Sequence, residues 1–536
     1  MKYGTLRRAD ERASSDLQGA AAPVVISARQ EGTAGDDVLT GTTGDDELFG
    51  RGGNDVLDGL AGQDTLTGGG GNDRYIVDRP GDLVVELSGN GSDVVASSVT
   101  YTLPDNVEKL ELTGTVAING IGNDLANVIV GNAAANTLNG QGGADVMEGG
   151  LGNDTYIVDH SKDRAVELAG GGTDLVVSSI NFALDDNVEQ LRLAGSASIN
   201  GTGNALVNTI SGNGGSNRID GGAGADTLNG RGGNDTYVVD DVDDKVKELE
   251  FNGIDTVESS VNYTLAQYVE NLTLTGTAAQ GRGNGSANII VGNAANNQLR
   301  GAGGADTLEG GAGTDTLRGE AGDDTYIIKE AHDIVIEATG QGTDLVKAQV
   351  SYSLEGEAIE NMELTGSAAI NGRGNGLVNE ISGNGAANKI NGEAGNDLLN
   401  GAGGGDTLIG GAGDDELRGG EGKDVLDGGS GKDGFYFDTA LDAGNVDQIQ
   451  FFKVADDTIF LERTIFAEVK TGAALADYAF QEGTKAQDWD DRIIYDQDSG
   501  KIYYDADGKG SVSAILFARV AEGTVLTHAD FATYTG

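Results

Sequence analysis

Aspartate recurs every nine residues in five blocks of this sequence, and this spacing is its clearest chemical signal. The repeated unit reads Gly, two small residues, Gly, a spacer, Asp, a spacer, an aliphatic residue and a spacer, and it runs unbroken from Gly392 to Asp433. The chain holds 25 copies, of which 17 carry Asp at the sixth place. We predict that these carboxylates are metal ligands: Asp37, Asp46, Asp55, Asp64, Asp73, Asp145, Asp154, Asp226, Asp235, Asp306, Asp315, Asp324, Asp397, Asp406, Asp415, Asp424 and Asp433.

The donor atoms of this unit suit calcium. Carboxylates together with backbone carbonyls form an all-oxygen site, which a hard cation prefers. A flexible site with several carbonyls favours Ca²⁺ over Mg²⁺, because Mg²⁺ requires a strict octahedron and retains its waters. The chain has no Cys and only three His, so it offers no cluster of transition-metal ligands. We therefore expect multiple Ca²⁺ ions.

The two glycines of each unit explain how the aspartates come together. Glycine at the first and fourth places permits left-handed backbone, so the first six residues can turn tightly with their carbonyls directed inward. Two units then complete one coil, and aspartates 18 residues apart lie about 4.8 Å from each other along the stack. Seven such pairs are uninterrupted: Asp37–Asp55, Asp46–Asp64, Asp55–Asp73, Asp306–Asp324, Asp397–Asp415, Asp406–Asp424 and Asp415–Asp433.

Eight nonapeptides carry Asn at the sixth place, two at the start of each later block. Asn can bond to the backbone of a turn but brings no negative charge. We expect these coils to hold the fold without strong metal binding. In the second and third blocks, every aspartate faces an Asn one coil earlier, and we predict that these four bind more weakly: Asp145, Asp154, Asp226 and Asp235.

Strand-rich modules interrupt the nonapeptides, and each starts at one of four tyrosines separated by 81, 81 and 89 residues: Tyr75, Tyr156, Tyr237 and Tyr326. Such long-period similarity indicates stacked repeats. Each module also holds an equivalent Glu and Asp: Glu86 and Asp93, Glu167 and Asp174, Glu248 and Asp255, Glu337 and Asp344. They could be catalytic pairs, but their recurrence favours a solvated strand face or auxiliary calcium ligands. We interpret the tyrosines as a buried aromatic stack.

The charge balance narrows the choice of partners. The formal net charge is −52, from 86 acidic and 34 basic residues. Repulsion on this scale opposes a compact state unless cations neutralise it, and it makes nucleic acid and anionic membranes unfavourable partners. No apolar run reaches the length of a membrane-spanning helix.

These patterns predict an all-β chain in three parts. Residues 1–31 form a flexible leader. Residues 32–433 form a solenoid of stacked coils, with nonapeptide blocks at 32–73, 122–154, 203–235, 283–324 and 374–433. Residues 434–536 form a small C-terminal β domain, because 16 of the 28 aromatic residues lie there and residues 491–520 read as three strands separated by turns.

The nonapeptide resembles the calcium-binding repeat of RTX proteins, the repeats-in-toxin or haemolysin-type family. The resemblance covers Gly32 to Asp433, apart from the four modules, and the tail resembles C-terminal domains of proteins exported by type I secretion. It implies a parallel β-roll that binds Ca²⁺, a type I secretion apparatus as partner, and a secreted, extracellular or cell-surface location. Residues 434–536 would carry the uncleaved secretion signal and cap the solenoid.

Two classes of function remain open. No HExxH or GxSxG motif is present, so we predict no catalytic or organic-cofactor residues and expect no enzyme. The expected function is a secreted calcium-binding protein that folds on binding Ca²⁺ outside the cell, with a structural, matrix or adhesive role toward extracellular polysaccharide or a cell surface. The alternative is an extracellular polysaccharide-modifying enzyme or its non-catalytic accessory module.

Overall fold

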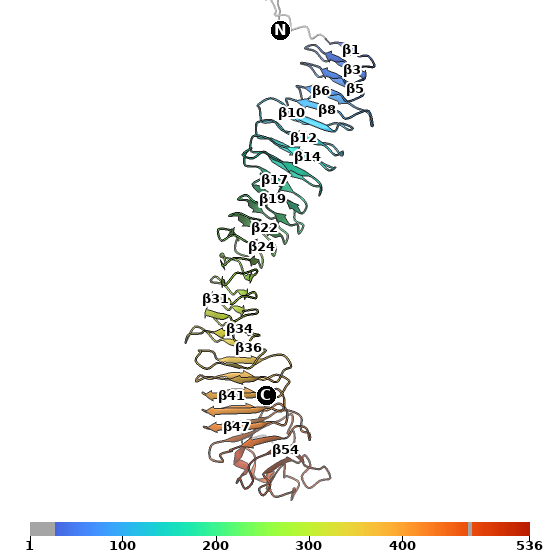
Figure 1. The fold of residues 1–536 in the computed structure, drawn as a ribbon. Helices are drawn as coiled ribbons and strands as arrows, with labels where there is room; N and C mark the ends of the chain where they lie inside the picture. The colour runs from blue at the N-terminus through green and yellow to red at the C-terminus, as the bar shows by residue number, and fades with distance from the viewer. Residues whose placement is uncertain (1–26, 470–473, 536) are drawn as a thin grey trace, which may run out of the picture. The chain divides into compact units, whose positions relative to one another are not determined.

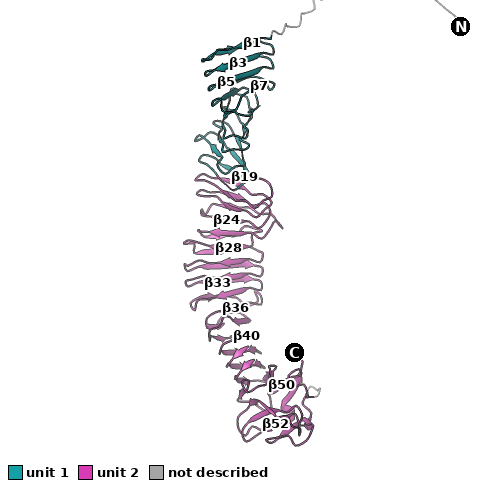
Figure 2. Cartoon of the chain, turned by 90° about the vertical axis from the view of Figure 1, so that its right-hand side faces the viewer, with its two compact units in different colours: residues 1–180, 184–190 teal, residues 181–183, 191–536 magenta. Residues whose placement is uncertain are grey.

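The computed structural model describes residues 27–469 and 474–535, and its regular structure is almost entirely β (Figure 1). Helical structure among these residues is limited to two 3-10 turns, Asp477–Ala479 and His528–Asp530. The chain divides into two compact units, residues 1–180 with 184–190 and residues 181–183 with 191–536 (Figure 2). No helix in the described ranges is long and apolar enough to cross a membrane.

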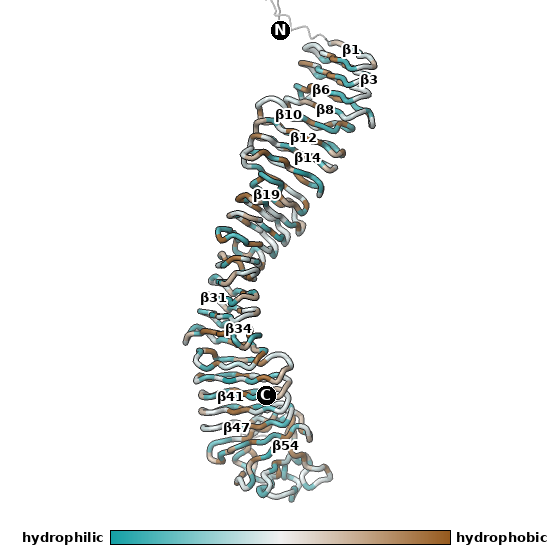
Figure 3. The backbone as a smooth tube through the Cα atoms, in the orientation of Figure 1, coloured by the Kyte–Doolittle hydropathy of each residue, from teal (hydrophilic) through white to brown (hydrophobic). Residues whose placement is uncertain are grey.

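Each nonapeptide ends in a short strand whose central side chain points into the coil. Strand β2 (Val38–Thr40) pairs in parallel with β4 (Val56–Asp58), and paired residues are 18 apart. The eighth-place Leu57 is fully buried, whereas its neighbours in the strand are partly exposed. This alternation is the two-residue period of a strand, and the coils in Figure 3 alternate accordingly between hydrophobic and hydrophilic residues. The expected 18-residue coil is confirmed.

Parallel strands stack on the faces of the solenoid in the first unit. One sheet comprises β1 (Arg29–Glu31), β3 (Glu47–Gly52), β5 (Thr65–Gly70) and β7 (Leu83–Val85). A second contains β2, β4, β6 (Arg74–Val77), β8 (Val94–Ser97), β10 (Lys109–Leu112), β12 (Val128–Val130), β14 (Val146–Glu148) and β16 (Arg164–Val166). A third contains β9 (Tyr101–Thr102), β11 (Gly120–Ile121), β13 (Thr137–Asn139), β15 (Thr155–Val158) and β17 (Leu175–Ser178).

The strand-rich modules continue these sheets with coils of other lengths. In the first module, Arg74 of β6 pairs with Val94 of β8, Val94 with Lys109 of β10, and Lys109 with Val128 of β12. The coils are therefore 20, 15 and 19 residues long. The nonapeptides and the modules therefore share the same parallel β-solenoid architecture, as the sequence predicts.

The second unit has the same architecture, and its longest sheet has 17 strands. That sheet contains β18 (Phe182–Ala183), β20 (Gly201–Thr202), β22 (Arg218–Asp220), β24 (Thr236–Val239), β26 (Thr256–Ser259), β28 (Asn271–Leu274), β30 (Ile289–Val291), β32 (Thr307–Glu309), β34 (Thr325–Ile328), β36 (Leu345–Ala348), β38 (Asn361–Leu364), β40 (Glu380–Ser382), β42 (Leu398–Asn400), β45 (Glu416–Arg418), β48 (Gly434–Phe437), β50 (Thr458–Glu462) and β55 (Phe531–Tyr534). Strand β19 (Gln190–Leu193) includes the boundary between the units.

The other strands of this unit form shorter sheets. Three of them pair in parallel, β21 (Thr209–Ser211), β23 (Thr227–Asn229) and β25 (Lys245–Val246). Five more strands form one sheet: β27 (Tyr263–Thr264), β29 (Gln280–Arg282), β31 (Gln298–Gly303), β33 (Thr316–Ala321) and β35 (Ile334–Val335). Ten more are β37 (Tyr352–Ser353), β39 (Asn371–Arg373), β41 (Lys389–Ala394), β44 (Thr407–Ala412), β47 (Val425–Ser430), β49 (Asp447–Gln450), β54 (Ile515–Arg519), β53 (Lys501–Tyr504), β52 (Ile493–Asp496) and β51 (Phe480–Glu482). The last two are β43 (Gly403–Gly404) and β46 (Glu421–Gly422).

Parallel pairing continues past the last nonapeptide. Strand β48 pairs with β45, and β49 with β47, both in parallel. Farther along, β52, β53 and β54 pair antiparallel, as the pattern of residues 491–520 predicts. Phe466 and Phe517 are buried with ring centroids 5.1 Å apart. The small C-terminal β region thus has an aromatic core at the end of two long sheets.

The solenoid begins before the first nonapeptide. Arg29–Glu31 form β1 and pair in parallel with β3, although the sequence predicts a flexible leader over residues 1–31. The backbone of β3 supplies the pairing edge, and Arg29 lies 3.1 Å from the carboxylate of Glu47. The predicted leader over residues 1–26 lies outside the described residues.

Candidate metal centres

The predicted aspartates lie at the edges of the solenoid, each directly before a strand. The backbone N–H of Asp37 donates to Oδ1 of Asp55 at 2.7 Å, and that of Asp397 donates to Oδ1 of Asp415 at 2.8 Å. This bond fixes each carboxylate against the neighbouring coil. The seven uninterrupted pairs are all joined in this way: Asp37–Asp55, Asp46–Asp64, Asp55–Asp73, Asp306–Asp324, Asp397–Asp415, Asp406–Asp424 and Asp415–Asp433.

The second oxygen of most of these carboxylates is buried without a hydrogen-bond partner. Asp415, for example, is 1% exposed, and its Oδ2 meets no donor in the described structure. A buried carboxylate oxygen without a partner costs several kcal/mol unless a proton or cation neutralises it. Fifteen of the 17 predicted ligands share this state: Asp55, Asp64, Asp73, Asp145, Asp154, Asp226, Asp235, Asp306, Asp315, Asp324, Asp397, Asp406, Asp415, Asp424 and Asp433.

The two aspartates nearest the start of the solenoid differ from the other fifteen, because their second oxygen has hydrogen-bond donors. Asp37 is partly exposed, and its Oδ2 accepts from the backbone N–H and the hydroxyl of Thr33 at 2.6 and 2.9 Å. Asp46 is buried, but its Oδ2 accepts from the N–H and the hydroxyl of Thr42. The sequence pattern treats these two like the others, because a Thr at the second place does not show which oxygen it will satisfy. Both carboxylates have less need of a cation.

The turns bring backbone carbonyls to the same space. A methyl group at first-place Gly50 would overlap Oδ2 of Asp55 and lie 2.6 Å from the carbonyl oxygen of Gly68. Fourth-place Gly71 has a φ of +129°, and a methyl group there would overlap the carbonyl oxygen of Gly53. Only glycine allows both close approaches. Carboxylate and carbonyl oxygens consequently face one another, and this oxygen-only donor set fits Ca²⁺.

Burial raises the pKa of the ladder carboxyls. The pKa of Asp406 and that of Asp415 rise to about 7, mainly because burial disfavours the charged form. Donation by a backbone N–H lowers each pKa, and the charge of a neighbouring aspartate raises it. The pKa of Asp397 rises to about 6 for the same main reason. A cation binding here competes with protons near neutral pH.

Sixth-place asparagines complete their hydrogen bonds without a cation. Oδ1 of Asn127 accepts from the N–H of Asn123 at 2.7 Å, and its amide donates to the carbonyl of Val107 at 3.1 Å. The amide of Asn136 donates to the carbonyl of Ile118 at 2.6 Å. The amide thus provides a donor that a carboxylate lacks. In the described residues, none of the eight is left without a partner: Asn127, Asn136, Asn208, Asn217, Asn288, Asn297, Asn379 and Asn388.

Carboxylates of the modules extend the aspartate ladders, and the nonapeptide pattern does not include them. The N–H of Asp64 donates to Oδ1 of Asp82 at 3.2 Å, and the N–H of Asp73 donates to Oδ1 of Asp93 at 2.7 Å. Both module residues directly precede a strand, which is the signal that could have identified them. Their counterparts behave alike: Asp163, Asp174, Asp244, Asp255, Asp333 and Asp344.

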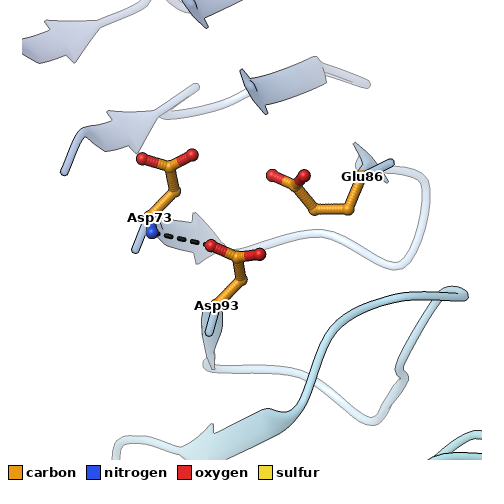
Figure 4. Close-up of side chains that lie close together, drawn as sticks. All are labelled: Asp73, Glu86 and Asp93. Atoms are coloured by element: carbon orange, nitrogen blue, oxygen red, sulfur yellow. Dashed lines mark hydrogen bonds between the residues drawn. The ribbon is translucent and has the colours of Figure 1, made fainter. Parts of the chain in front are cut away.

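A glutamate joins the ladder where each module begins. Asp73, Glu86 and Asp93 each place an oxygen in a common space, and these atoms lie within 4.8 Å of one another (Figure 4). Glu86 is 7% exposed, so the interpretation as a solvated strand face is wrong for this residue. The other modules repeat the group: Asp154, Glu167 and Asp174; Asp235, Glu248 and Asp255; Asp324, Glu337 and Asp344.

The four module tyrosines are buried, but they do not form an aromatic stack. Each hydroxyl instead donates to the glutamate of its own module, as Tyr75 does to Glu86. In the described part of the chain, close ring pairs lie between residues 435 and 534. Tyrosines more than 80 residues apart are several coils from one another, which explains why their rings do not meet.

Comparison with known proteins agrees with this chemistry. A family model described as the RTX calcium-binding nonapeptide repeat matches residues 31–66, 49–79, 121–156, 202–237, 282–317, 291–326, 373–408 and 400–435, which together include all five blocks. No curated protein matches the chain in sequence. Among solved structures, the extracellular lipase LipA from Serratia marcescens is 12% identical, with a TM-score of 0.13, over 57% of this chain and 67% of the lipase. Similarity at that level carries no argument about activity.

Proposed function

We propose that this chain, whose five nonapeptide blocks are RTX calcium-binding repeats, is a secreted protein that folds when it binds Ca²⁺ outside the cell. The ions supply positive charge between successive coils. The chain's own residues determine where that charge is needed, because each ladder aspartate is held by the N–H of the coil before it.

The row of buried, unpartnered carboxylate oxygens carries this proposal. Without cations, ladder carboxylates repel one another in a poorly hydrated space, and the net charge of −52 adds to that repulsion. With Ca²⁺, the same oxygens link neighbouring coils. The unfolded chain has no preformed sites, so the free energy of binding becomes free energy of folding.

The proposed ligands differ in how strongly we expect them to bind calcium. Asp37 and Asp46 already have donors to both oxygens or are partly exposed, so they bind weakly. Eight others accept from the N–H of an Asn one coil earlier, so only one carboxylate borders the space on that side of them: Asp145, Asp154, Asp226, Asp235, Asp306, Asp315, Asp397 and Asp406. The remaining seven accept from the N–H of another aspartate one coil earlier, so two carboxylates border the space between those coils, and these spaces are the stronger ladder sites.

Export fits this chemistry. At the low free Ca²⁺ concentration inside a cell, the charge keeps the chain disordered, and a disordered chain can pass through a narrow type I secretion channel. Residues 434–536 would act as the uncleaved secretion signal and as the cap of the solenoid. The protein would then fold in the extracellular medium or at the cell surface.

The role that this design supports is structural, matrix-forming or adhesive. The module carboxylates that could have formed a catalytic pair are at most 9% exposed, as Glu248 is, so a polymer cannot reach them. Calcium at the edges of the coils could instead be shared with acidic extracellular polysaccharide. A glycan array probed with and without Ca²⁺ tests that partner class.

Circular dichroism of the full chain tests calcium-dependent folding. We expect a disordered spectrum in chelator and a β spectrum after Ca²⁺ is restored, with no comparable effect of Mg²⁺ at the same concentration. A chain that is equally β-structured in both conditions would refute the proposal.

A further inference from the structure

Four clusters of three carboxylates differ from the nonapeptide ladders. In the first, Asp73 ends a nonapeptide block, Asp93 follows one coil later, and Glu86 reaches in from the loop between them (Figure 4). Their nearest oxygens lie within 4.8 Å of one another. A ladder space has two carboxylates at most along the stack, whereas this one has three.

Burial and missing partners point to a ligand in this space. Asp73 is 1% exposed and its Oδ2 has no hydrogen-bond partner in the described structure. The second and fourth clusters each leave two such oxygens, and the third leaves one: Asp154, Asp174, Asp235, Asp324 and Asp344. Three buried carboxylates cannot all be charged at this separation unless a cation lies among them.

The glutamate is held in place from behind by two donors. The hydroxyl of Tyr75 donates to Oε1 of Glu86, and the N–H of Leu87 donates to Oε2 at 3.2 Å. The tyrosine is itself oriented by the N–H of Gly68, which donates to its oxygen at 2.9 Å. Donors on a carboxylate favour its charged form and fix its direction. The glutamate carboxylate is therefore held in a fixed direction beside the two aspartates.

We propose that each of these four clusters is a separate Ca²⁺ site, completed by the module glutamate and tighter than the ladder sites. More ligand charge on a rigid site raises calcium affinity. Each site would join the last nonapeptide to the first coils of its module, where the coil length changes from 18 to 20 residues. This inference deepens the proposed function and rests on it, because it concerns which ions hold the same fold.

The test is a calcium titration by calorimetry on the full chain and on E86Q/E167Q/E248Q/E337Q. We expect the variant to lose four ions per chain, all from the tightest class, while the weaker class is unchanged. Asp244→Asn is the matched control. It removes a buried acid from the same module as Glu248, but both of its oxygens already accept from N–H groups of Asp226, Asp240 and Asp241. It should lose no tight ion.

Single variants keep the test decisive if the quadruple variant does not fold. Glu248→Gln alone should lose one tight ion. It should also lose part of the tyrosine-sensitised luminescence of bound Tb³⁺, because the hydroxyl of Tyr237 donates to that glutamate. Unchanged stoichiometry and luminescence in Glu248→Gln would overturn the inference. That result would indicate that protons, and not Ca²⁺, neutralise the three carboxylates. A wild-type chain that folds with Ca²⁺ but shows only one affinity class would also overturn it. A wild-type chain that binds no Ca²⁺ would instead refute the proposed function itself.

Discussion

At the scale of single residues, the choice between Asp and Asn at the sixth place decides what a coil can bind. The two side chains have nearly the same shape and occupy equivalent positions, yet Asp415 leaves a buried oxygen without a partner and Asn217 does not. The amide of Asn217 donates to the carbonyl of Ile199 at 2.6 Å. Aspartate coils therefore need a cation, and asparagine coils supply their own donor.

Replacing one residue of each kind separates these roles. Asp415→Ala should lower the number of bound Ca²⁺ ions, because its carboxylate borders the coils of both Asp397 and Asp433. Asn217→Ala should leave that number unchanged but lower the free energy of unfolding by about 1–3 kcal/mol, because the carbonyl of Ile199 loses its donor. Calorimetric titration gives the first quantity, and urea denaturation in saturating calcium gives the second. An equal loss of ions in both variants would contradict the distinction.

Acidification should weaken calcium binding. The pKa values of ladder carboxyls in the metal-free fold, about 6 for Asp397 and about 7 for Asp406, lie above the unfolded value of about 4. Protonation therefore stabilises the metal-free fold: this stabilisation is complete below about pH 4 and is lost as the pH rises through 6 to 7.

This pH dependence predicts the result of two measurements between pH 8 and pH 5.5. Calcium affinity should fall as the pH falls, because protons occupy the same oxygens. The metal-free chain should gain β structure over the same range, as followed by circular dichroism in calcium-free buffer. An affinity that is independent of pH would show that these carboxyls are not the ligands.

At the scale of the element, the coil exists because glycine lets neighbouring turns approach closely. Fourth-place Gly71 has a positive φ, and its α-carbon faces the carbonyl of Gly53 too closely for any side chain. Its neighbour Gly70 is different, because a methyl group there would come no closer than 3.9 Å to another atom. The turn thus requires glycine at position 71 but not at position 70.

Alanine substitution at these two neighbours tests the turn. Gly71→Ala should raise the calcium concentration at the folding midpoint, because the backbone strain costs about 1–3 kcal/mol. Gly70→Ala, the control, should leave the midpoint within error of the wild type. Equal midpoints for the two variants would show that the close approach does not limit folding.

The regular coils could be predicted from the sequence, whereas the modules could not. A constant period fixes the register, so the pairing of Asp397 with Asp415 follows from counting 18 residues. The modules change the coil length to 20, 15 and 19 residues, so no fixed count places Glu86 beside Asp73 and Asp93. The sequence does not indicate the strand Arg29–Glu31 for a related reason, because this strand pairs through its backbone and lacks the glycine pattern.

At the scale of the whole molecule, we propose that charge and the C-terminal segment determine when the chain folds. The ladders continue past the nonapeptides: the N–H of Asp424 donates to Oδ1 of Asp447 at 3.1 Å, and that of Asp433 donates to Oδ1 of Asp457 at 3.2 Å. The core that follows is aromatic, with the rings of Phe437, Phe466 and Phe517 packed together. We expect folding to start at this junction and to proceed toward the N-terminus.

Deleting residues 434–536 should therefore raise the calcium concentration needed to fold the remainder. The deletion removes Asp447 and Asp457 as partners of the last two nonapeptides and also removes the apolar core. A calcium titration followed by circular dichroism measures the midpoint. A midpoint that does not move would show that this segment does not contribute to calcium-dependent folding.

The position of the ions tests the central claim most directly. Crystals grown with calcium should give anomalous-difference peaks beside Oδ2 of the ladder aspartates, such as Asp406 and Asp415, and none between the coils of Asn288 and Asn297 and those that precede them. Folded coils in calcium whose aspartate oxygens have no ion beside them would contradict the account.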